Sequence, residues 1–128
     1  MTIDSSALLA ILLGEAGALD LVDVILEADT ARVGAPTLVE TAIVLGNRRG
    51  KPSMKEVIGL IEELGVTIVP FDAVHMTAAV DAFERFGRGR HKAALNFGDC
   101  LAYATAATAR DSLLFVGQDF VKTDIKRP

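Results

Sequence analysis

Four acidic residues are the side chains of this sequence best suited to chemistry. Asp4, Glu40 and Asp99 each interrupt a stretch of apolar residues, and Asp119 follows a fourth apolar stretch. A carboxylate in apolar surroundings is costly to bury unless it is paired or bound to a metal, and several carboxylates together repel one another. A hard divalent cation such as Mg²⁺ binds oxygen ligands and relieves that repulsion. The pattern therefore predicts a metal site, although each acid taken singly could instead complement the dipole of a helix N-terminus.

Alternating strand and helix patterns must bring these acids together. Short apolar and β-branched runs predict strands at residues 2–4, 32–35, 66–69 and 113–116. Amphipathic and alanine-rich segments predict helices at about residues 5–13, 18–28, 36–49, 52–65, 72–86 and 96–109. We expect Ser5 or Ser6 to cap the first helix and Asp72 to cap the fifth.

This order of elements predicts one α/β domain over residues 1–128. Strands separated by helical crossovers form parallel sheets that are covered by helices on both faces. In such sheets, functional groups gather at the carboxyl ends of the strands. Asp4 ends the first strand, Asp119 follows the last, and Glu40 and Asp99 lie near the starts of two helices. We therefore expect all four acids at the same edge of the sheet.

The composition fits a single domain in a reducing compartment. The chain has 128 residues, of which 51% are hydrophobic and 23% are charged, so it can bury a substantial core. Its one cysteine, Cys100, excludes an internal disulfide and a multi-cysteine metal site. The apolar run at residues 7–13 lacks a basic leader and is far shorter than the roughly 20 residues that span a bilayer. We expect a cytoplasmic protein without a membrane segment.

The charge distribution leaves nucleic acid possible as a partner. The net charge of −4 argues against phosphate binding by the molecule as a whole. Basic residues nevertheless cluster at positions 85–92 and again at positions 48–51. In the first cluster, Arg88, Arg90 and His91 are candidates for contacting RNA phosphate or an acidic partner segment, and a solvated loop is the alternative.

Other readings of the reactive residues are weaker. Cys100 has no histidine at a helping distance in sequence, so we interpret it as a small buried hydrophobe. His75 lies on an expected helix among apolar residues, where a core or surface role is the default. A phosphoryl-receiver domain would want an acidic pair after the first strand, but Ser5 and Ser6 follow Asp4.

The motifs, taken in order, resemble PIN-domain toxins of the VapC type. The matching segments are Ile3-Asp4-Ser5-Ser6-Ala7-Leu8, Ala35-Pro36-Thr37-Leu38-Val39-Glu40, Gly87-Arg88-Gly89-Arg90-His91, Leu95-Asn96-Phe97-Gly98-Asp99-Cys100, Leu113-Leu114-Phe115-Val116-Gly117-Gln118-Asp119-Phe120 and Thr123-Asp124-Ile125. Each is weak alone, but their order and spacing cover nearly the whole chain.

The resemblance implies a fold, an activity and a partner. The fold would be a three-layer α/β/α sandwich with a central, mostly parallel sheet. The activity would be an Mg²⁺- or Mn²⁺-dependent endoribonuclease, acting as the toxin of a type II toxin–antitoxin pair. The partner would be a VapB-type antitoxin whose tail fills the active-site groove, with a homodimer of the toxin inside a larger complex.

The family pattern also assigns roles to individual residues. Asp4, Glu40 and Asp99 match the first three acidic positions and would bind the metal, while Ser6 matches a small hydroxyl residue that supports the site. The fourth acidic position differs, because many relatives carry an acid where this chain has Gly117, which leaves Asp119 as the nearest candidate. That departure keeps one alternative open, a catalytically inactive PIN-like module that only binds its partner.

Overall fold

The computed structural model describes residues 1–128 as four short strands and six helices. The strands are β1 (Thr2–Ile3), β2 (Arg32–Gly34), β3 (Thr67–Val69) and β4 (Leu113–Leu114). The helices are α1 (Ser5–Leu12), α2 (Ala18–Glu27), α3 (Ala35–Arg49), α4 (Met54–Glu63), α5 (Ala73–Phe86) and α6 (Phe97–Ala109). The predicted alternation of strands and helices is confirmed, and no end is shifted by more than two residues.

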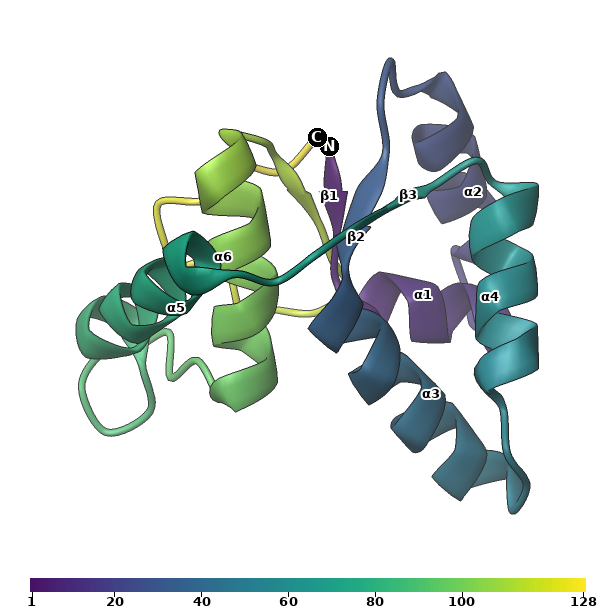
Figure 1. Cartoon of the computed structure of the whole chain (residues 1–128), viewed down its shortest axis with the longest axis horizontal. Helices are drawn as coiled ribbons and strands as arrows, with labels where there is room; N and C mark the ends of the chain where they lie inside the picture. The colour runs from purple at the N-terminus through teal and green to yellow at the C-terminus, as the bar shows by residue number, and fades with distance from the viewer.

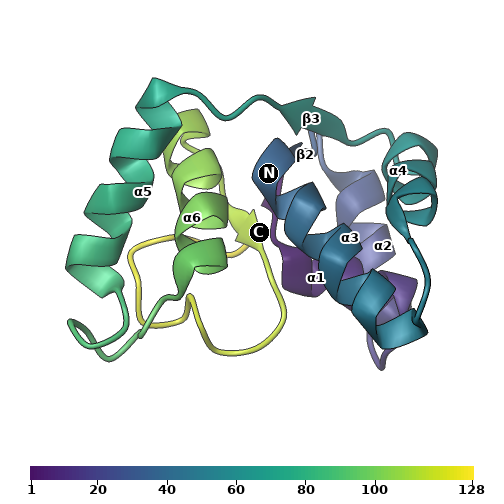
Figure 2. The same cartoon turned by 60° about the horizontal axis from the view of Figure 1, so that its bottom comes forward.

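The strands form one parallel sheet between two layers of helices. The strand order is β3-β2-β1-β4, and every pairing is parallel. Helices α1 to α4 lie on one side of the sheet, and α5 and α6 lie on the other (Figures 1 and 2). The predicted α/β/α sandwich is therefore confirmed, and its sheet is entirely parallel.

Each face of the sheet has its own hydrophobic core. On one side, Ile3 and Val33 of the sheet pack with buried residues of α1 to α4, such as Leu8 and Leu45. The other core joins the alanines of α5 and α6 to Leu113 of β4 and to Phe115 and Phe120 of the segment that follows it. Small side chains suit α6 because they allow α5 to pack closely against it.

The chain changes direction across the sheet between β1 and β4. Strand β1 pairs with β2 on one side and with β4 on the other, so the connections leave this point in opposite directions. In parallel sheets, such a switch point opens a crevice outside the carboxyl ends of the strands. Helices α3 and α6 both begin at this edge and contact each other there (Figure 1).

Two local predictions were wrong in an informative way. Asp4, not Ser5 or Ser6, caps α1, because its side chain accepts the N–H of Ser6. Strand β4 ends at Leu114 instead of Val116, since the Val116 N–H donates to the Ser6 hydroxyl at 3.0 Å and not to a neighbouring strand. Both differences come from side chains that take over backbone hydrogen bonds at the carboxyl edge.

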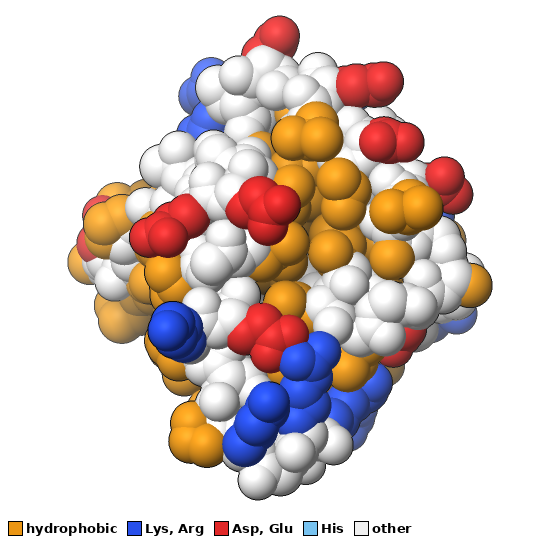
Figure 3. Space-filling model, turned by 90° about the vertical axis from the view of Figure 1, so that its right-hand side faces the viewer, with side chains coloured by type: hydrophobic (Ala, Val, Ile, Leu, Met, Phe, Trp, Pro, Cys, Tyr) orange, Lys and Arg blue, Asp and Glu red, His pale blue; other side chains and the backbone are white.

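The face over α2 and α4 carries apolar and basic groups of its own. Figure 3 shows hydrophobic side chains in a hollow at the centre of this face and Lys and Arg side chains at its lower end. In the second basic cluster of the sequence, Arg48 pairs with Glu15 and Arg49 with Glu56. This cluster is thus engaged in ion pairs between elements. None of the helices combines the length and the apolar character needed to cross a membrane.

Candidate active site

Asp4 is the most deeply buried of the four predicted acids. It follows β1 directly and is 4% exposed. Its Oδ2 accepts hydrogen bonds from the Ser6 N–H at 3.0 Å and the Ser6 hydroxyl at 2.5 Å. Burial raises the pKa of Asp4, the bonds from Ser6 oppose that effect, and the negative charge of Asp119 adds to it.

Ser6 links two strand ends at the switch point. Its hydroxyl donates to Asp4 and accepts the N–H of Val116, so it joins the residue after β1 to the segment after β4. A side chain that holds both an acid and the opposite backbone fits the supporting role that the sequence predicts for it.

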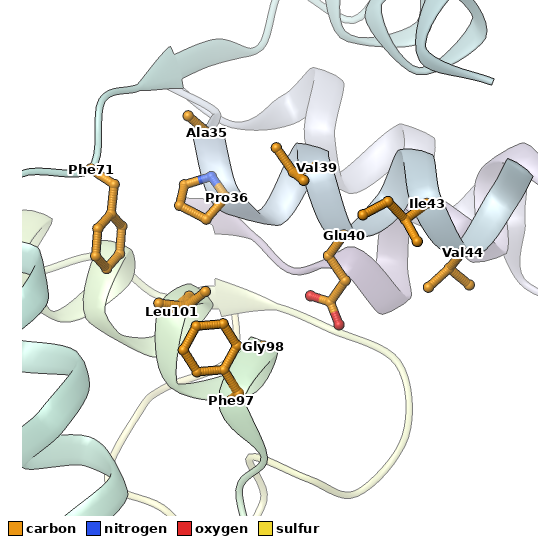
Figure 4. Close-up of a pocket in the computed structure, with 10 residues that line it drawn as sticks. All are labelled: Ala35, Pro36, Val39, Glu40, Ile43, Val44, Phe71, Phe97, Gly98 and Leu101. Atoms are coloured by element: carbon orange, nitrogen blue, oxygen red, sulfur yellow. The ribbon is translucent and has the colours of Figure 1, made fainter. Parts of the chain in front are cut away.

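Glu40 approaches the same edge from α3. It is half-buried in the second turn of that helix, and its carboxylate points toward the first turn of α6 (Figure 4). Desolvation is the main cause that raises the pKa of Glu40, and the charge of Asp4 raises it further. The nearby Ser5 side chain acts in the opposite direction and lowers this pKa.

Asp99 combines a structural and an electrostatic role. It is the third residue of α6, and its Oδ2 accepts the Asn96 N–H at 2.8 Å while Asn96 Oδ1 accepts the Asp99 N–H at 2.9 Å. Even so, desolvation raises the pKa of Asp99 to about 6, with further contributions from the charges of Asp4, Asp119 and Glu40. Helix capping and membership of an acidic cluster are therefore not alternatives here, because one carboxylate does both.

Asp119 completes the acidic group from the segment after β4. It is exposed, and it accepts no hydrogen bond from the protein, yet its charge raises the pKa of both Asp4 and Asp99. The preceding Gly117 has φ +95°, a conformation that side chains rarely adopt. An acid at position 117 would be strained, and the chain instead places its acid two residues later.

The donor set suits a hard divalent cation. Acids from three other segments, Asp4, Glu40 and Asp119, lie close enough to Asp99 at this edge for their charges to raise its pKa. Oδ1 of Asp99 accepts no hydrogen bond and is open to a ligand. No three acidic, histidine or cysteine side chains already surround a common point closely enough to hold an ion by direct contacts alone. Because Mg²⁺ usually keeps several waters and takes only one or two carboxylates, its chemistry still fits this open arrangement.

An apolar groove of about 780 Å³ runs beside Glu40. Its lining residues are Ala35, Pro36, Val39, Glu40, Ile43, Val44, Phe71, Phe97, Gly98 and Leu101 (Figure 4). Phe97 stands 79% exposed at its edge. Sequence reasoning missed Gly98 and Ser5 as neighbours of Glu40, since only the packing of α1, α3 and α6 brings them together.

The basic loop between α5 and α6 is only partly free. A bridge between Gly87 and Leu95 closes it, and Arg88 and Arg90 are exposed. His91 is used locally, because its Nδ1 accepts the Ala93 N–H at 3.1 Å. Since the loop leads directly into α6, it lies at the end of that helix where Asp99 sits.

Arg85, which belongs to this cluster in sequence, points elsewhere. It pairs with Asp124 at 2.5 Å and with Asp81 at 3.3 Å. The Tyr103 hydroxyl also donates to Asp124, at 2.6 Å. Asp124 therefore anchors the C-terminal segment to α5 and α6.

Cys100 and His75 do not join the acidic cluster. Cys100 is 3% exposed. Burial, together with the charge of Asp99, raises its pKa to about 11, so the thiol stays protonated and is a poor nucleophile. His75 forms a capping box with Asp72 at the start of α5.

Comparison with known proteins agrees with this fold. The family model described as "PIN domain" matches residues 1–126. The chain is 42% identical to ribonuclease VapC36 of Mycobacterium tuberculosis over 127 residues, covering 98% of this chain and 91% of that protein. It is 39% identical to ribonuclease VapC of Mycolicibacterium smegmatis, covering 98% of this chain and 97% of that protein. The chain belongs to the PIN-domain family. Within that family its relatives place it with the VapC type.

Solved structures show the same fold at lower sequence identity. The M. tuberculosis toxin VapC20, described as cleaving the sarcin–ricin loop, has a TM-score of 0.78 at 17% identity, with 99% of this chain and 98% of that chain covered. A toxin–antitoxin complex from Klebsiella pneumoniae has a TM-score of 0.71 at 14% identity, with 96% and 92% covered.

Proposed function

We propose that this protein is a metal-dependent endoribonuclease and the toxin of a type II toxin–antitoxin pair. The observation that carries the proposal is the convergence of Asp4, Glu40, Asp99 and Asp119, from four separate segments, on the carboxyl edge of the sheet. They lie close enough there for the neighbouring acids to raise the pKa of Asp4, Glu40 and Asp99. Its relatives, which are named ribonucleases, support the choice of RNA as substrate.

Asp4, Asp99 and Glu40 are the residues that would hold Mg²⁺ or Mn²⁺. A divalent ion held there would lower the pKa of a bound water and would offset the charge that develops on a phosphodiester. Ser6 fixes the orientation of the Asp4 carboxylate, and the Asn96 N–H fixes that of Asp99. Asp119, exposed and without a hydrogen-bond partner, stands free to orient a water or accept a proton. No side chain has to act as a covalent nucleophile.

The proposed partner is a VapB-type antitoxin. The structural neighbour from K. pneumoniae, which is a toxin–antitoxin complex, supports this assignment. A segment of the antitoxin would lie over the acidic edge and exclude RNA from it. We also expect a homodimer of the toxin within the larger complex.

The direct test is RNA cleavage by the purified wild-type protein. We expect cleavage with Mn²⁺ or Mg²⁺ and none in EDTA, because the acids alone carry the wrong charge to stabilise a phosphate. Calorimetric titration of Mn²⁺ into the metal-free protein should give saturable binding. Equal cleavage in EDTA would reject metal dependence, and the absence of both binding and cleavage would favour the inactive binding module.

Charge reversal in the α5–α6 loop tests the path of the RNA. We expect Arg88→Glu together with Arg90→Glu to weaken cleavage roughly tenfold at low salt and to make it less sensitive to salt, because each lost phosphate contact reduces counterion release. Arg110→Glu, at the opposite end of α6, is the matched control. The measurement is the cleavage rate as a function of salt concentration. If the dependence of the rate on salt were the same in the variant and the wild type, these arginines would not contact the RNA.

A further inference from the structure

We propose that Gly98 is a positioning residue for Glu40, because it leaves the space in which the Glu40 carboxylate lies. A Cβ built at position 98 would sit 2.5 Å from Oε1 and 2.6 Å from Oε2 of Glu40. Real Cβ atoms essentially never approach another atom within 3.0 Å. The inference rests on the proposed function, in which Glu40 helps to hold the metal.

The backbone at Gly98 does not itself require glycine. Gly98 is the second residue of α6, and its φ lies outside the left-handed region that disfavours side chains. Alanine is the better helix former at such a position. The three atoms nearest to the added Cβ all belong to the Glu40 carboxyl group, so local helix structure favours a methyl group that only Glu40 opposes.

This contact couples two helices at the edge where the acids meet. Glu40 comes from α3 and Gly98 from α6, next to Asp99 (Figure 4). The Glu40 carboxylate lies near enough to Ser5 and Asp4 for both to affect its pKa, which places it within the cluster. A methyl group at position 98 would push the carboxylate away from α6 and toward the apolar groove.

The far end of a glutamate side chain can move at little cost to the fold. We therefore expect Gly98→Ala to keep or raise the thermal midpoint while it impairs the site. The affinity for Mn²⁺, measured by calorimetry, should fall at least about threefold, and RNA cleavage at saturating Mn²⁺ should fall about tenfold, on the scale seen for groups that orient metal ligands. Because only placement is disturbed, the loss should lie in kcat more than in KM.

The matched control is Gly59→Ala in α4. Gly59 is also helical, and a Cβ there meets nothing within 4 Å. This variant should retain wild-type Mn²⁺ affinity and wild-type cleavage. If Gly59→Ala impaired both as much as Gly98→Ala does, the effect would not come from the contact with Glu40, and the inference would fall.

A shorter acid provides the rescue test. Glu40→Asp retracts the carboxylate by one methylene group and makes room for the methyl at position 98. The double variant should therefore cleave RNA no worse than Glu40→Asp alone, a non-additivity that reports direct contact. Additive losses, or a Gly98→Ala variant with wild-type affinity and cleavage, would overturn the inference.

A measurement without metal separates this inference from the proposed function. The carbon-13 resonance of the Glu40 carboxyl in metal-free protein should shift in Gly98→Ala and stay in place in Gly59→Ala. An unmoved resonance in Gly98→Ala rejects the positioning contact, whatever the activity. Conversely, a wild-type protein that neither binds Mn²⁺ nor cleaves RNA rejects the proposed function, while the resonance still decides whether Gly98 positions Glu40.

Discussion

Asp99→Asn is expected to lower metal-dependent RNA cleavage by at least about 100-fold, the loss of several kcal/mol of charge stabilisation that a bound metal supplies. Asparagine keeps the size of the side chain and can still accept the Asn96 N–H, but it lacks the negative charge that attracts a cation. Cleavage rates and Mn²⁺ titration of the variant and the wild type measure the effect.

The same substitution should make the metal-free protein more stable at neutral pH. The raised pKa of Asp99, about 6, means that its charge is disfavoured in the folded state, chiefly by desolvation. The folded state therefore binds this proton more tightly than the unfolded chain does. Stability rises as pH falls from above the folded pKa toward the ordinary value of 3.8, and the cost of the charge is fully present at pH 7.5. Asparagine removes that cost.

Asp20→Asn is the matched control for this prediction. Asp20 is also the third residue of its helix, α2, but it is exposed and lies outside the acidic cluster. Its replacement should leave cleavage unchanged and should lower stability by about 0.3–1 kcal/mol, through the weaker interaction with the helix dipole. Wild-type cleavage by Asp99→Asn, or a loss of stability like that of Asp20→Asn, would reduce Asp99 to a helix-capping residue.

Mn²⁺ should stabilise the wild-type protein strongly at pH 7.5 and weakly at pH 5. At a concentration about 100 times its Kd, a ligand that binds only the folded state adds about 2.7 kcal/mol. Metal and proton compete for the same carboxylates, and the pKa of Asp4, Glu40 and Asp99 is raised in each case. As pH falls through about 6, protonation of Asp99 should weaken metal binding and cleavage together.

Thermal denaturation with and without Mn²⁺ at the two pH values measures this linkage. Asp99→Asn, denatured under the same conditions, shows how much of the metal effect depends on that carboxylate. An equal rise in the thermal midpoint at pH 5 and pH 7.5 would mean that the metal binds away from the acidic cluster.

Much of the fold follows from local patterns. The structure contains a strand at the β-branched run before Pro70 and a helix at the alanine-rich segment after Asn96. Two further helices end at or just before Gly50 and Gly65, as expected. The ends of elements were harder to predict, because side chains compete for backbone groups there. Asp4 sets the start of α1 through a local hydrogen bond from the Ser6 N–H, two residues further on. Ser6 sets the end of β4 by accepting the N–H of Val116, which is distant in sequence.

The sequence alone was less able to sort the charged residues. It grouped Arg85 with the basic loop, whereas the fold turns Arg85 to Asp124. It treated capping and metal binding as alternatives for Asp99, whereas the structure gives that residue both a capping hydrogen bond and three acidic neighbours. Ion pairing depends on distance in space, and residue spacing predicts that distance only within one helix or strand.

The sequence by itself determined the order of strands and helices, the parallel sheet and the edge at which Asp4, Glu40 and Asp99 would meet, because periodicity and crossover geometry are local or general rules. Only the tertiary structure decided how these acids are held. The hydrogen bond that Ser6 accepts from Val116 across the switch point, the turn at Gly117 that places Asp119, and the space that Gly98 leaves for Glu40 all depend on the packing of elements far apart in the chain. Such contacts have no periodic signature, since each is set by the relative position of two elements in space.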